Sequence, residues 1–334
     1  MILIADSGST KTAWKFIDNR KNADEMGVFY TEGINPFYQN SAEIVAGLRH
    51  CHCGLDPQSP EKGGSDFRQN DGLCHCGLDP QSPEKGGFDF RQNDGLCHCG
   101  LDPQSPVRQN DVTNIFFYGA GCHFPDKKET VRQALQQFFP TAEIEINNDL
   151  LAACRALFGK EAGIACILGT GSNSCFYDGE KIAANVSPLG YILGDEGSGA
   201  VLGKLLVADM LKNQLPETLK NKFLAQYETS TADILDNVYK RPFPNRYLAK
   251  FAQFIGENRN EEAIYNLVYR SFRSFFERNV MQYERYPVAF IGSVAFYFRD
   301  ILEKVADDLG LNISKIEQSP MEGLCAFHKN AFFD

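Results

Sequence analysis

One carboxylate near the start of the chain stands between an apolar segment and a turn of small residues. Residues 1–12 read MILIADSGSTKT, so Asp6 follows four apolar residues and one alanine and precedes a Ser/Gly/Thr turn. Small residues let a backbone approach phosphate groups closely, and their N–H and hydroxyl groups can hold phosphate oxygens. A carboxylate beside them can orient Mg²⁺ or its water shell. This pattern suits a metal-bound polyphosphate, with Asp6 on the metal and with phosphate ligands at Ser9, Thr10, Lys11 and Thr12.

A second turn of the same kind follows in the other half of the chain. The apolar run Ile164 to Leu168 leads into the four residues Gly169, Thr170, Gly171 and Ser172. Each Gly/Ser/Thr turn taken alone is also typical of an ordinary tight turn. Two turns that each follow an apolar strand predict a nucleotide held between two halves of the chain.

Two further motifs carry a family resemblance. Leu189 to Gly199 reads LGYILGDEGSG and is similar to the LGxxxGDEGSG signature of N-acetylglucosamine kinases, and Phe290 to Val294 resembles the adenosine-site turn of the same proteins. From Met1 to about residue 330 the chain resembles the N-acetylglucosamine kinases of the BadF/BadG/BcrA/BcrD ATPase family, within the actin-like sugar kinase superfamily. The resemblance implies an α/β fold of two ribonuclease-H-like lobes, with ATP and sugar in the cleft between them.

The resemblance also implies roles for single residues. Asp149 lies at a junction of strand and helix, where its sequence position alone favours a helix N-cap. In the family the catalytic Asp occupies this junction, so Asp149 is predicted to accept the proton of the attacking sugar hydroxyl. The other residues expected to bind sugar are Asn35, Gly119, Gly121, Ser172, Gly190 and Asp195. The residues expected to bind ATP, besides the two turns, are Gly292 and Ser293.

Three functions compete at this stage. The first is an ATP- and Mg²⁺-dependent kinase acting on the 6-hydroxyl of N-acetylglucosamine or a related amino sugar. The second is an iron–sulfur ATPase that activates a 2-hydroxyacyl-CoA dehydratase, for which Cys166 would be the cluster ligand near the second turn. The third is a sensor of sugar or nucleotide without catalysis. We favour the kinase, because both turns and a candidate base are present.

A repeat interrupts the first half. Cys51 to Leu73 is repeated from Cys74 to Leu96 with one change, and a shortened third copy starts at Cys97. The unit is rich in Gly, Pro, Asp, Gln and Ser and poor in large apolar residues, so it cannot bury enough surface to fold. We expect residues 51–110 to be a disordered surface insertion. Its Cys-His-Cys triplets hold six of the 11 cysteines, and a functional zinc site there is disfavoured.

Composition limits the class of protein. The 334 residues carry a net charge of −10, which argues against a nucleic-acid or anionic-membrane partner. No apolar run approaches the length of a membrane span, and no signal peptide is recognised. We expect a cytoplasmic enzyme with a small-molecule sugar substrate, and a homodimer is an open possibility.

Around the insertion, strands alternate with helices, which favours mixed sheets covered by helices. We expect one lobe over residues 1–160, a second over 161–319, and a C-terminal helix at 320–334 near the lobe interface. Expected strands are 26–31, 113–118, 144–146, 164–168, 174–178 and 288–291, besides a strand, turn and second strand in 1–16. Expected helices are 41–48, 127–139, 149–158 and 261–281.

Overall fold

The structure is a computed structural model of the 334-residue chain. It describes residues 1–8, 10–18, 27–50 and 111–333, so the predictions for Ser9 and for the insertion at 51–110 lie outside the described residues. The chain divides into two compact units. The first holds the described residues up to Ala152 together with those from Met321 onward, and the second runs from Ala153 to Pro320.

The first unit is built on a five-stranded sheet of order β3-β2-β1-β4-β5. β1 pairs antiparallel with β2, and β2 with β3, whereas β1, β4 and β5 run parallel. The strands of this sheet are β1 (Ile2–Ser7), β2 (Lys11–Ile17), β3 (Phe29–Glu32), β4 (Asn114–Gly119) and β5 (Glu143–Asn148).

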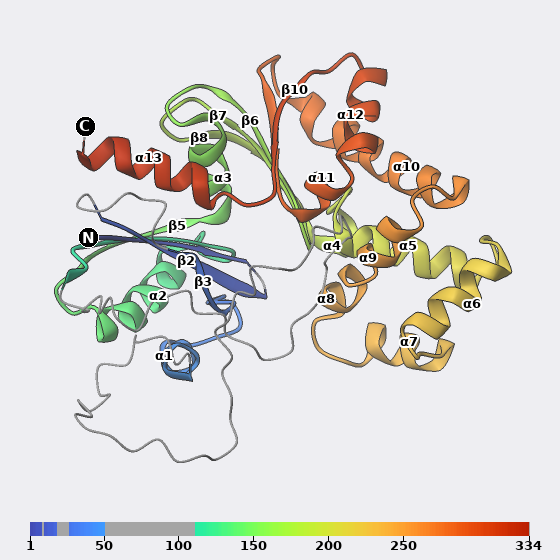
Figure 1. The fold of residues 1–334 in the computed structure, drawn as a ribbon, viewed down its shortest axis with the longest axis horizontal. Coiled ribbons are helices and arrows are strands. Elements are labelled where there is room, and N and C mark those ends of the chain that lie inside the picture. The colour runs from blue at the N-terminus through green and yellow to red at the C-terminus, as the bar shows by residue number, and fades with distance from the viewer. Residues whose placement is uncertain (9, 19–26, 51–110, 334) are drawn as a thin grey trace, which may run out of the picture. The chain divides into compact units, whose positions relative to one another are not determined.

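Helices accompany both faces of this sheet (Figure 1). α1 (Ser41–His50) and α2 (Pro125–Phe138) pack on one another and on β3 and β5. The C-terminal helix α13 (Met321–Phe333) packs on β1 and β2, and His328 stacks on the Phe116 ring of β4. On the α1–α2 side the core is aromatic, since the fully buried Trp14 ring stacks with Phe29 at 6.2 Å between centroids. Such burial of large apolar side chains is the main stabilising contribution.

The second unit repeats the same topology. Its sheet order is β10-β9-β6-β7-β8, in which β6, β7 and β8 are antiparallel neighbours and β6, β9 and β10 run parallel. Read from β8 to β10, with β6 taken as the first strand of the unit, this order is the same as that of the first sheet. The strands are β6 (Gly163–Leu168), β7 (Ser172–Tyr177), β8 (Ile182–Val186), β9 (Val288–Ile291) and β10 (Ile313–Glu317).

Helices make up the rest of the second unit. Among its buried aromatics, Phe275 and Phe276 pack with Phe290 of β9, and Phe272 packs with Phe298. Phe272 and Phe276 are therefore core residues, as their spacing of four predicts. The helices are α3 (Asp149–Phe158), which starts in the first unit, α4 (Gly190–Leu193), α5 (Gly199–Leu211), α6 (Glu217–Gln226), α7 (Thr231–Tyr239), α8 (Pro244–Ala249), α9 (Ala252–Glu257), α10 (Glu262–Arg278), the 3₁₀ helix η3 (Val280–Gln282), α11 (Ser293–Tyr297) and α12 (Arg299–Asp308).

The predicted fold class is confirmed, because each unit has the ribonuclease-H-like strand order. The strands expected at 164–168 and 288–291 and the helix at 149–158 match β6, β9 and α3 within one residue. The five described cysteines, among them Cys166, are buried and form no disulfide, as expected of small core residues. No helix in the described part of the chain is long and apolar enough to cross a membrane.

Candidate active site

The first unit gathers candidate groups where its parallel strands end. In the sheet register Ser7 lies opposite Gly119, and Gly119 lies opposite Asn148, so the last residues of β1, β4 and β5 form one row. Asp6 lies one residue before this row and Asp149 one residue after it. We call this row with its two carboxylates the carboxylate edge. The ends of parallel strands are a common place for ligands in α/β folds.

The two carboxylates of this edge interact electrostatically. Burial, and next the negative charge of Asp149, raise the pKa of Asp6 to about 7, and the charge of Lys11 opposes the rise. Burial also raises the pKa of Asp149, against backbone N–H groups and the charge of His123. Burial, and next the charge of Asp149, raise the pKa of the Cys122 thiol to about 12. Two half-buried carboxylates with raised pKa values are typical of a site that takes up a cation or a proton.

Helix α3 has its own cap at this edge. The Asn148 side-chain Oδ1 accepts the Leu151 N–H at 2.8 Å, which is the usual bond of an N-cap residue. The side chain of Asp149, the next residue, accepts the adjacent Leu150 N–H at 3.0 Å. The capping function that the sequence suggested for Asp149 therefore belongs to Asn148.

The first predicted phosphate turn joins β1 to β2. Gly8 donates its N–H to the Lys11 carbonyl at 3.0 Å, which closes the turn. The Thr12 hydroxyl is fully buried, lies 2.7 Å from the Ser7 hydroxyl and donates to the Glu32 carbonyl at 3.1 Å. Thr12 thus stabilises the turn through buried hydrogen bonds, whereas Thr10 and Lys11 are exposed. The phosphate contacts assigned to these residues stay predictions.

Gly33 packs directly against this turn. Its N–H donates to the Thr10 carbonyl at 3.0 Å. A Cβ at position 33 would lie 2.8 Å from the Gly8 carbonyl oxygen and 2.9 Å from the Thr10 carbonyl carbon, so only glycine fits without a shift. The residue after it, Ile34, donates its N–H to the Ser7 hydroxyl at 3.0 Å. These bonds hold the Gly33–Ile34 segment to the turn.

Two candidate sugar residues meet beside the carboxylate edge. Gly121 has φ +85°, and a Cβ there would lie 2.6 Å from Asn35 Oδ1. Asn35 Oδ1 also accepts the Phe37 N–H at 3.0 Å, which shapes its loop. Gly119 ends β4, and the next residue, Ala120, donates its N–H to the Ser7 carbonyl at 3.0 Å. The structure therefore brings Asn35, Gly119 and Gly121 together in the first unit.

The sequence interpretation missed His123 and its neighbour Phe124. Both are exposed in the loop that joins β4 to α2, and the charge of His123 lowers the pKa of Asp149. Neither residue belongs to a periodic pattern or to a motif used above. Their closeness along the chain to Gly121 was the available signal.

In the second unit, the turn between β6 and β7 packs against Asp195. The Asp195 carboxylate accepts the Ser172 N–H at 3.3 Å, and a Cβ at Gly171 would lie 3.1 Å from Asp195 Oδ2. Burial raises the pKa of Asp195 to about 6, with the Ser172 N–H opposing the rise. The carbonyls of Gly169 and Thr170 accept the first two N–H groups of helix α5, at 2.8 and 3.1 Å. The turn and the start of α5 are thus one rigid structure.

The remaining candidates of the second unit border this turn or Asp195. Gly292 has φ +123°, and a Cβ there would lie 2.2 Å from the Leu168 carbonyl oxygen, directly before the turn. Ser293 is the first residue of α11. Gly190 begins α4 with φ +74°, and the loop closes where Asp195 donates its N–H to the Pro188 carbonyl at 2.9 Å. Glu196 forms an ion pair with Arg278 at 2.8 Å and holds the loop to α10.

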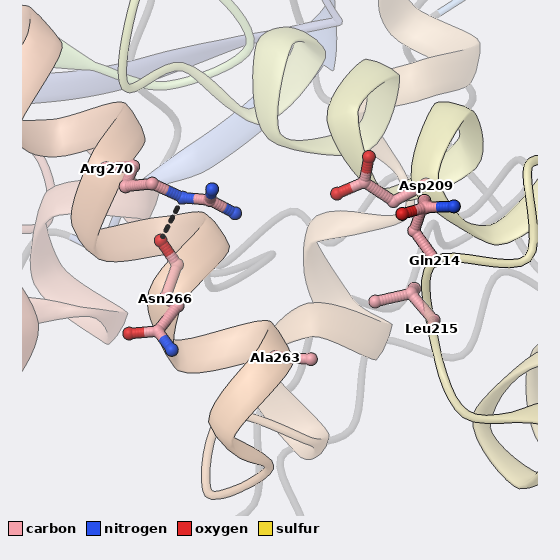
Figure 2. Close-up of a pocket in the computed structure, with 6 residues that line it drawn as sticks. All are labelled: Asp209, Gln214, Leu215, Ala263, Asn266 and Arg270. Atoms are coloured by element: carbon pink, nitrogen blue, oxygen red, sulfur yellow. Dashed lines mark hydrogen bonds between the residues drawn. The ribbon is translucent and has the colours of Figure 1, made fainter.

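A cavity of about 420 Å³ opens elsewhere in the second unit (Figure 2). Its walls come from the end of α5 and the following loop on one side and from α10 on the other, and its lining residues are Asp209, Gln214, Leu215, Ala263, Asn266 and Arg270. None of the residues predicted to bind ATP or sugar lines it. Arg270 donates from Nε to the Asn266 carbonyl of its own helix at 3.1 Å.

Comparison with known proteins gives matches over nearly the full length of the chain. No family model matches the chain. A solved structure from Porphyromonas gingivalis, provisionally described as an N-acetylglucosamine kinase, is 42% identical, covers 99% of both chains and superposes with a TM-score of 0.80. A second structure of the same description, from Chromobacterium violaceum, is 15% identical over 98% of both chains, with a TM-score of 0.62, and shows the fold alone.

A curated relative matches over a shorter stretch. The glucosamine kinase of Vibrio cholerae is 35% identical over 89 residues, which are 27% of this chain and 30% of that protein. The match thus spans less than a third of the curated relative. The long match to the Porphyromonas protein, together with the duplicated topology, shows that the chain belongs to the family of N-acetylglucosamine kinases.

Proposed function

We propose that the chain is an ATP-dependent kinase that phosphorylates the 6-hydroxyl of N-acetylglucosamine or a related amino sugar, with Asp149 as the general base. The observation that carries the proposal is the position of Asp149 at the carboxylate edge, next to a helix cap made by Asn148. A general base works best when its pKa lies near the operating pH, and burial moves the pKa of Asp149 in that direction. The Asp149 carboxylate would take the proton of the attacking hydroxyl.

The residues present fit a magnesium ion at Asp6. Its pKa of about 7 reflects a half-buried carboxylate beside a second carboxylate, an arrangement that a divalent cation would stabilise. Asp6 would hold the ion, directly or through water. A bound Mg²⁺ supplies positive charge that offsets the negative charge of the phosphates. Lys11 would add a second positive charge from the neighbouring turn.

Backbone and side chains of the turns would position the substrates. In the first unit Thr10 and Lys11 would bind phosphate, and Asn35, Gly119 and Gly121 would bind the sugar. In the second unit the turn Gly169–Ser172 would bind phosphate, and Asp195 would accept hydrogen bonds from sugar hydroxyls. We further propose that Gly292 and Ser293 border the adenosine, and that the enzyme acts in the cytoplasm, where ATP is available. A homodimer and a cleft between the lobes remain predictions.

The dehydratase activator is less well supported. Cys166 lies in the core strand β6 with no exposed surface, and burial raises the pKa of its thiol well above the ordinary value. A cluster ligand shared between two subunits needs an accessible thiolate. Iron analysis of anaerobically purified protein would separate the two functions, because the kinase proposal predicts no stoichiometric iron.

A substrate panel tests the kinase proposal. The purified chain is incubated with Mg²⁺-ATP and, in turn, N-acetylglucosamine, glucosamine, N-acetylmannosamine, N-acetylmuramic acid and glucose, and ADP release is followed. The phosphorylated carbon of each product is then identified by NMR. We expect sugar-dependent ADP release with at least one amino sugar and phosphate on carbon 6. ADP release that no sugar stimulates, or phosphate on carbon 1, would contradict the proposal.

A further inference from the structure

Two exposed phenylalanines stand side by side on the first unit. Phe37 and Phe124 each leave 51% of their surface exposed, and their rings meet edge to face, 6.2 Å between centroids at 82°. The His123 ring meets Phe124 in the same manner at 5.5 Å, and the Lys127 ammonium lies 5.5 Å from the centre of the Phe37 ring. We call Phe37 and Phe124 the aromatic wall. Large apolar side chains that gather on a surface commonly mark a place where something binds.

The aromatic wall is continuous with the candidate sugar residues. Phe37 donates its N–H to Asn35 Oδ1 at 3.0 Å. Gly121, three residues before Phe124, approaches both Asn35 and Phe37 so closely that a Cβ there would lie 2.8 Å from Phe37 Cδ2. This close approach packs the two loops that carry Phe37 and Phe124 against each other.

The loop that carries Phe124 also interacts electrostatically with the candidate base. His123 is the residue next to Phe124, and its charge is close enough to lower the pKa of Asp149. The same loop therefore reaches from the aromatic wall towards the carboxylate edge. A ligand whose hydroxyl meets Asp149 would have the rest of its ring near these two loops.

The chemistry of a sugar suits such a wall. A pyranose ring carries hydroxyls around its rim, whereas its C–H groups form an apolar face. Aromatic rings offer a large apolar surface with a negative π face, which attracts weakly positive C–H groups. Ligand sites usually combine apolar and aromatic walls with a few polar groups that fix orientation. Here Asn35, whose Oδ1 accepts the Phe37 N–H, and the proposed base Asp149 are the candidate polar groups.

We propose that Phe37 and Phe124 form one wall of the sugar site and pack against the C–H face of the amino sugar, which makes them specificity-determining residues of the reaction. This inference rests on the proposed function. Because it concerns binding, it can be tested without turnover. The wall would act on sugar affinity and leave the chemical step to Asp149.

The test measures binding and turnover separately. Isothermal titration with N-acetylglucosamine is performed on the full chain and on the variants Phe37→Ala, Phe124→Ala and Phe37→Tyr, with Tyr239→Ala as control. Tyr239 is 80% exposed on α7 of the second unit, so its loss removes an exposed aromatic ring that belongs to neither of these loops. We expect the sugar Kd to rise about tenfold in each Phe→Ala variant and to stay within about twofold in Phe37→Tyr and Tyr239→Ala, since a tenfold change is an ordinary loss for one good contact. The KM for ATP and the melting temperature should not change.

Other outcomes are decisive in different ways. If the parent binds the sugar and both Phe→Ala variants bind it with the same Kd, the wall is not part of the sugar site. If these variants instead change from dimer to monomer on gel filtration with unchanged sugar Kd, the wall is an interface between copies, and the proposal is wrong. Sugar binding by the parent without any ADP release would contradict only the kinase function, and the sugar Kd of the variants would still test the role of Phe37 and Phe124. No binding of any amino sugar by the parent would overturn both.

Discussion

The negative charge of Asp149 raises the pKa of Asp6, so a carboxylate of strand β1 and one at the start of helix α3 share one electrostatic environment at the end of the first sheet. The parallel register of β1, β4 and β5 brings them to the same edge, although 142 intervening residues separate them in sequence. The charge of Lys11 opposes the rise for Asp6, and the charge of His123 opposes it for Asp149. A bound cation or a proton would lower the repulsion between the two carboxylates further.

Replacement of Asp149 tests the base. We expect Asp149→Asn to lower kcat by about two orders of magnitude or more, because general-base catalysis typically contributes 10²- to 10⁴-fold. Sugar and ATP affinities should stay close to those of the parent. The matched control is Asn148→Ala, which should lower stability by about 1 kcal/mol through loss of the helix cap and have a much smaller effect on kcat. The reverse ranking of the two variants in kcat would show that Asp149 is structural.

Replacement of Asp6 tests the pH dependence of stability. The folded-state pKa of about 7 exceeds the ordinary value of 3.8, so the folded chain binds more protons than the unfolded chain between these values. The stability that the folded chain gains by keeping Asp6 protonated is fully present below about pH 4 and is lost as the pH rises through 7. In the absence of metal and nucleotide, we expect Asp6→Asn to be more stable than the parent at pH 8, by about 1–3 kcal/mol after allowance for partial exposure, and this difference should shrink as the pH falls.

Thermal unfolding at pH 5 and pH 8, with and without Mg²⁺-ATP, measures this difference. Mg²⁺-ATP should raise the melting temperature of the parent more than that of Asp6→Asn. A difference between parent and variant that does not depend on pH would show that Asp6 is ionised in the folded chain, and the assignment of its raised pKa would then be wrong.

The contact between Gly33 and the first turn predicts a sharp contrast between two glycines. Gly33→Ala places a Cβ 2.8 Å from a carbonyl oxygen and should lower stability by about 1–3 kcal/mol, with a rise in the KM for ATP. Gly47→Ala, in helix α1, meets nothing closer than 3.8 Å and should be neutral or stabilising by about 0.5–1 kcal/mol. Denaturant unfolding of the two variants checks this. Equal stability of the two would mean that the turn can move away from Gly33.

Asp195 and Glu196 are adjacent acids with different predicted roles. Asp195→Asn should raise the KM for sugar about tenfold or more, since its carboxylate is the proposed acceptor for sugar hydroxyls. Glu196→Gln removes an ion pair to Arg278, which is 62% exposed, and should change stability by less than about 1 kcal/mol. Steady-state kinetics with varied sugar distinguishes them. A larger effect of Glu196→Gln on the sugar KM would reverse the two assignments.

Much of the fold could be predicted from the sequence where apolar residues are dense. β6 and β9 are almost wholly buried, so their apolar runs end where the strands end. The edge strands β8 and β10 were missed because none of their residues is fully buried and they show no clear alternation. Helix α6 was also missed, since only Leu219 and Phe223 of its ten residues are buried.

The candidate site was predictable to the extent that it is local. The two turns and Asp149 stand in short motifs. In contrast, the support of the first turn by Gly33 joins segments that are 23 residues apart, and no single-sequence pattern reports such a contact. The exposed His123 and Phe124 were missed for a related reason, because their significance comes from Asn35 and Phe37, which lie on another loop.

The position of the long repeat in the chain explains how the protein could acquire it without loss of activity. α1 ends at His50 and β4 begins at Asn114, so the repeat enters at the amino-terminal end of β4, whereas Gly119 and the carboxylates lie at the opposite end of the same parallel strands. Extra length at that point need not interrupt any strand or either predicted phosphate turn, and loop-closure entropy grows only slowly with length. Deletion of residues 51–106 should therefore leave kinase activity intact. Natural selection for catalytic activity would then not eliminate the repeat from the gene.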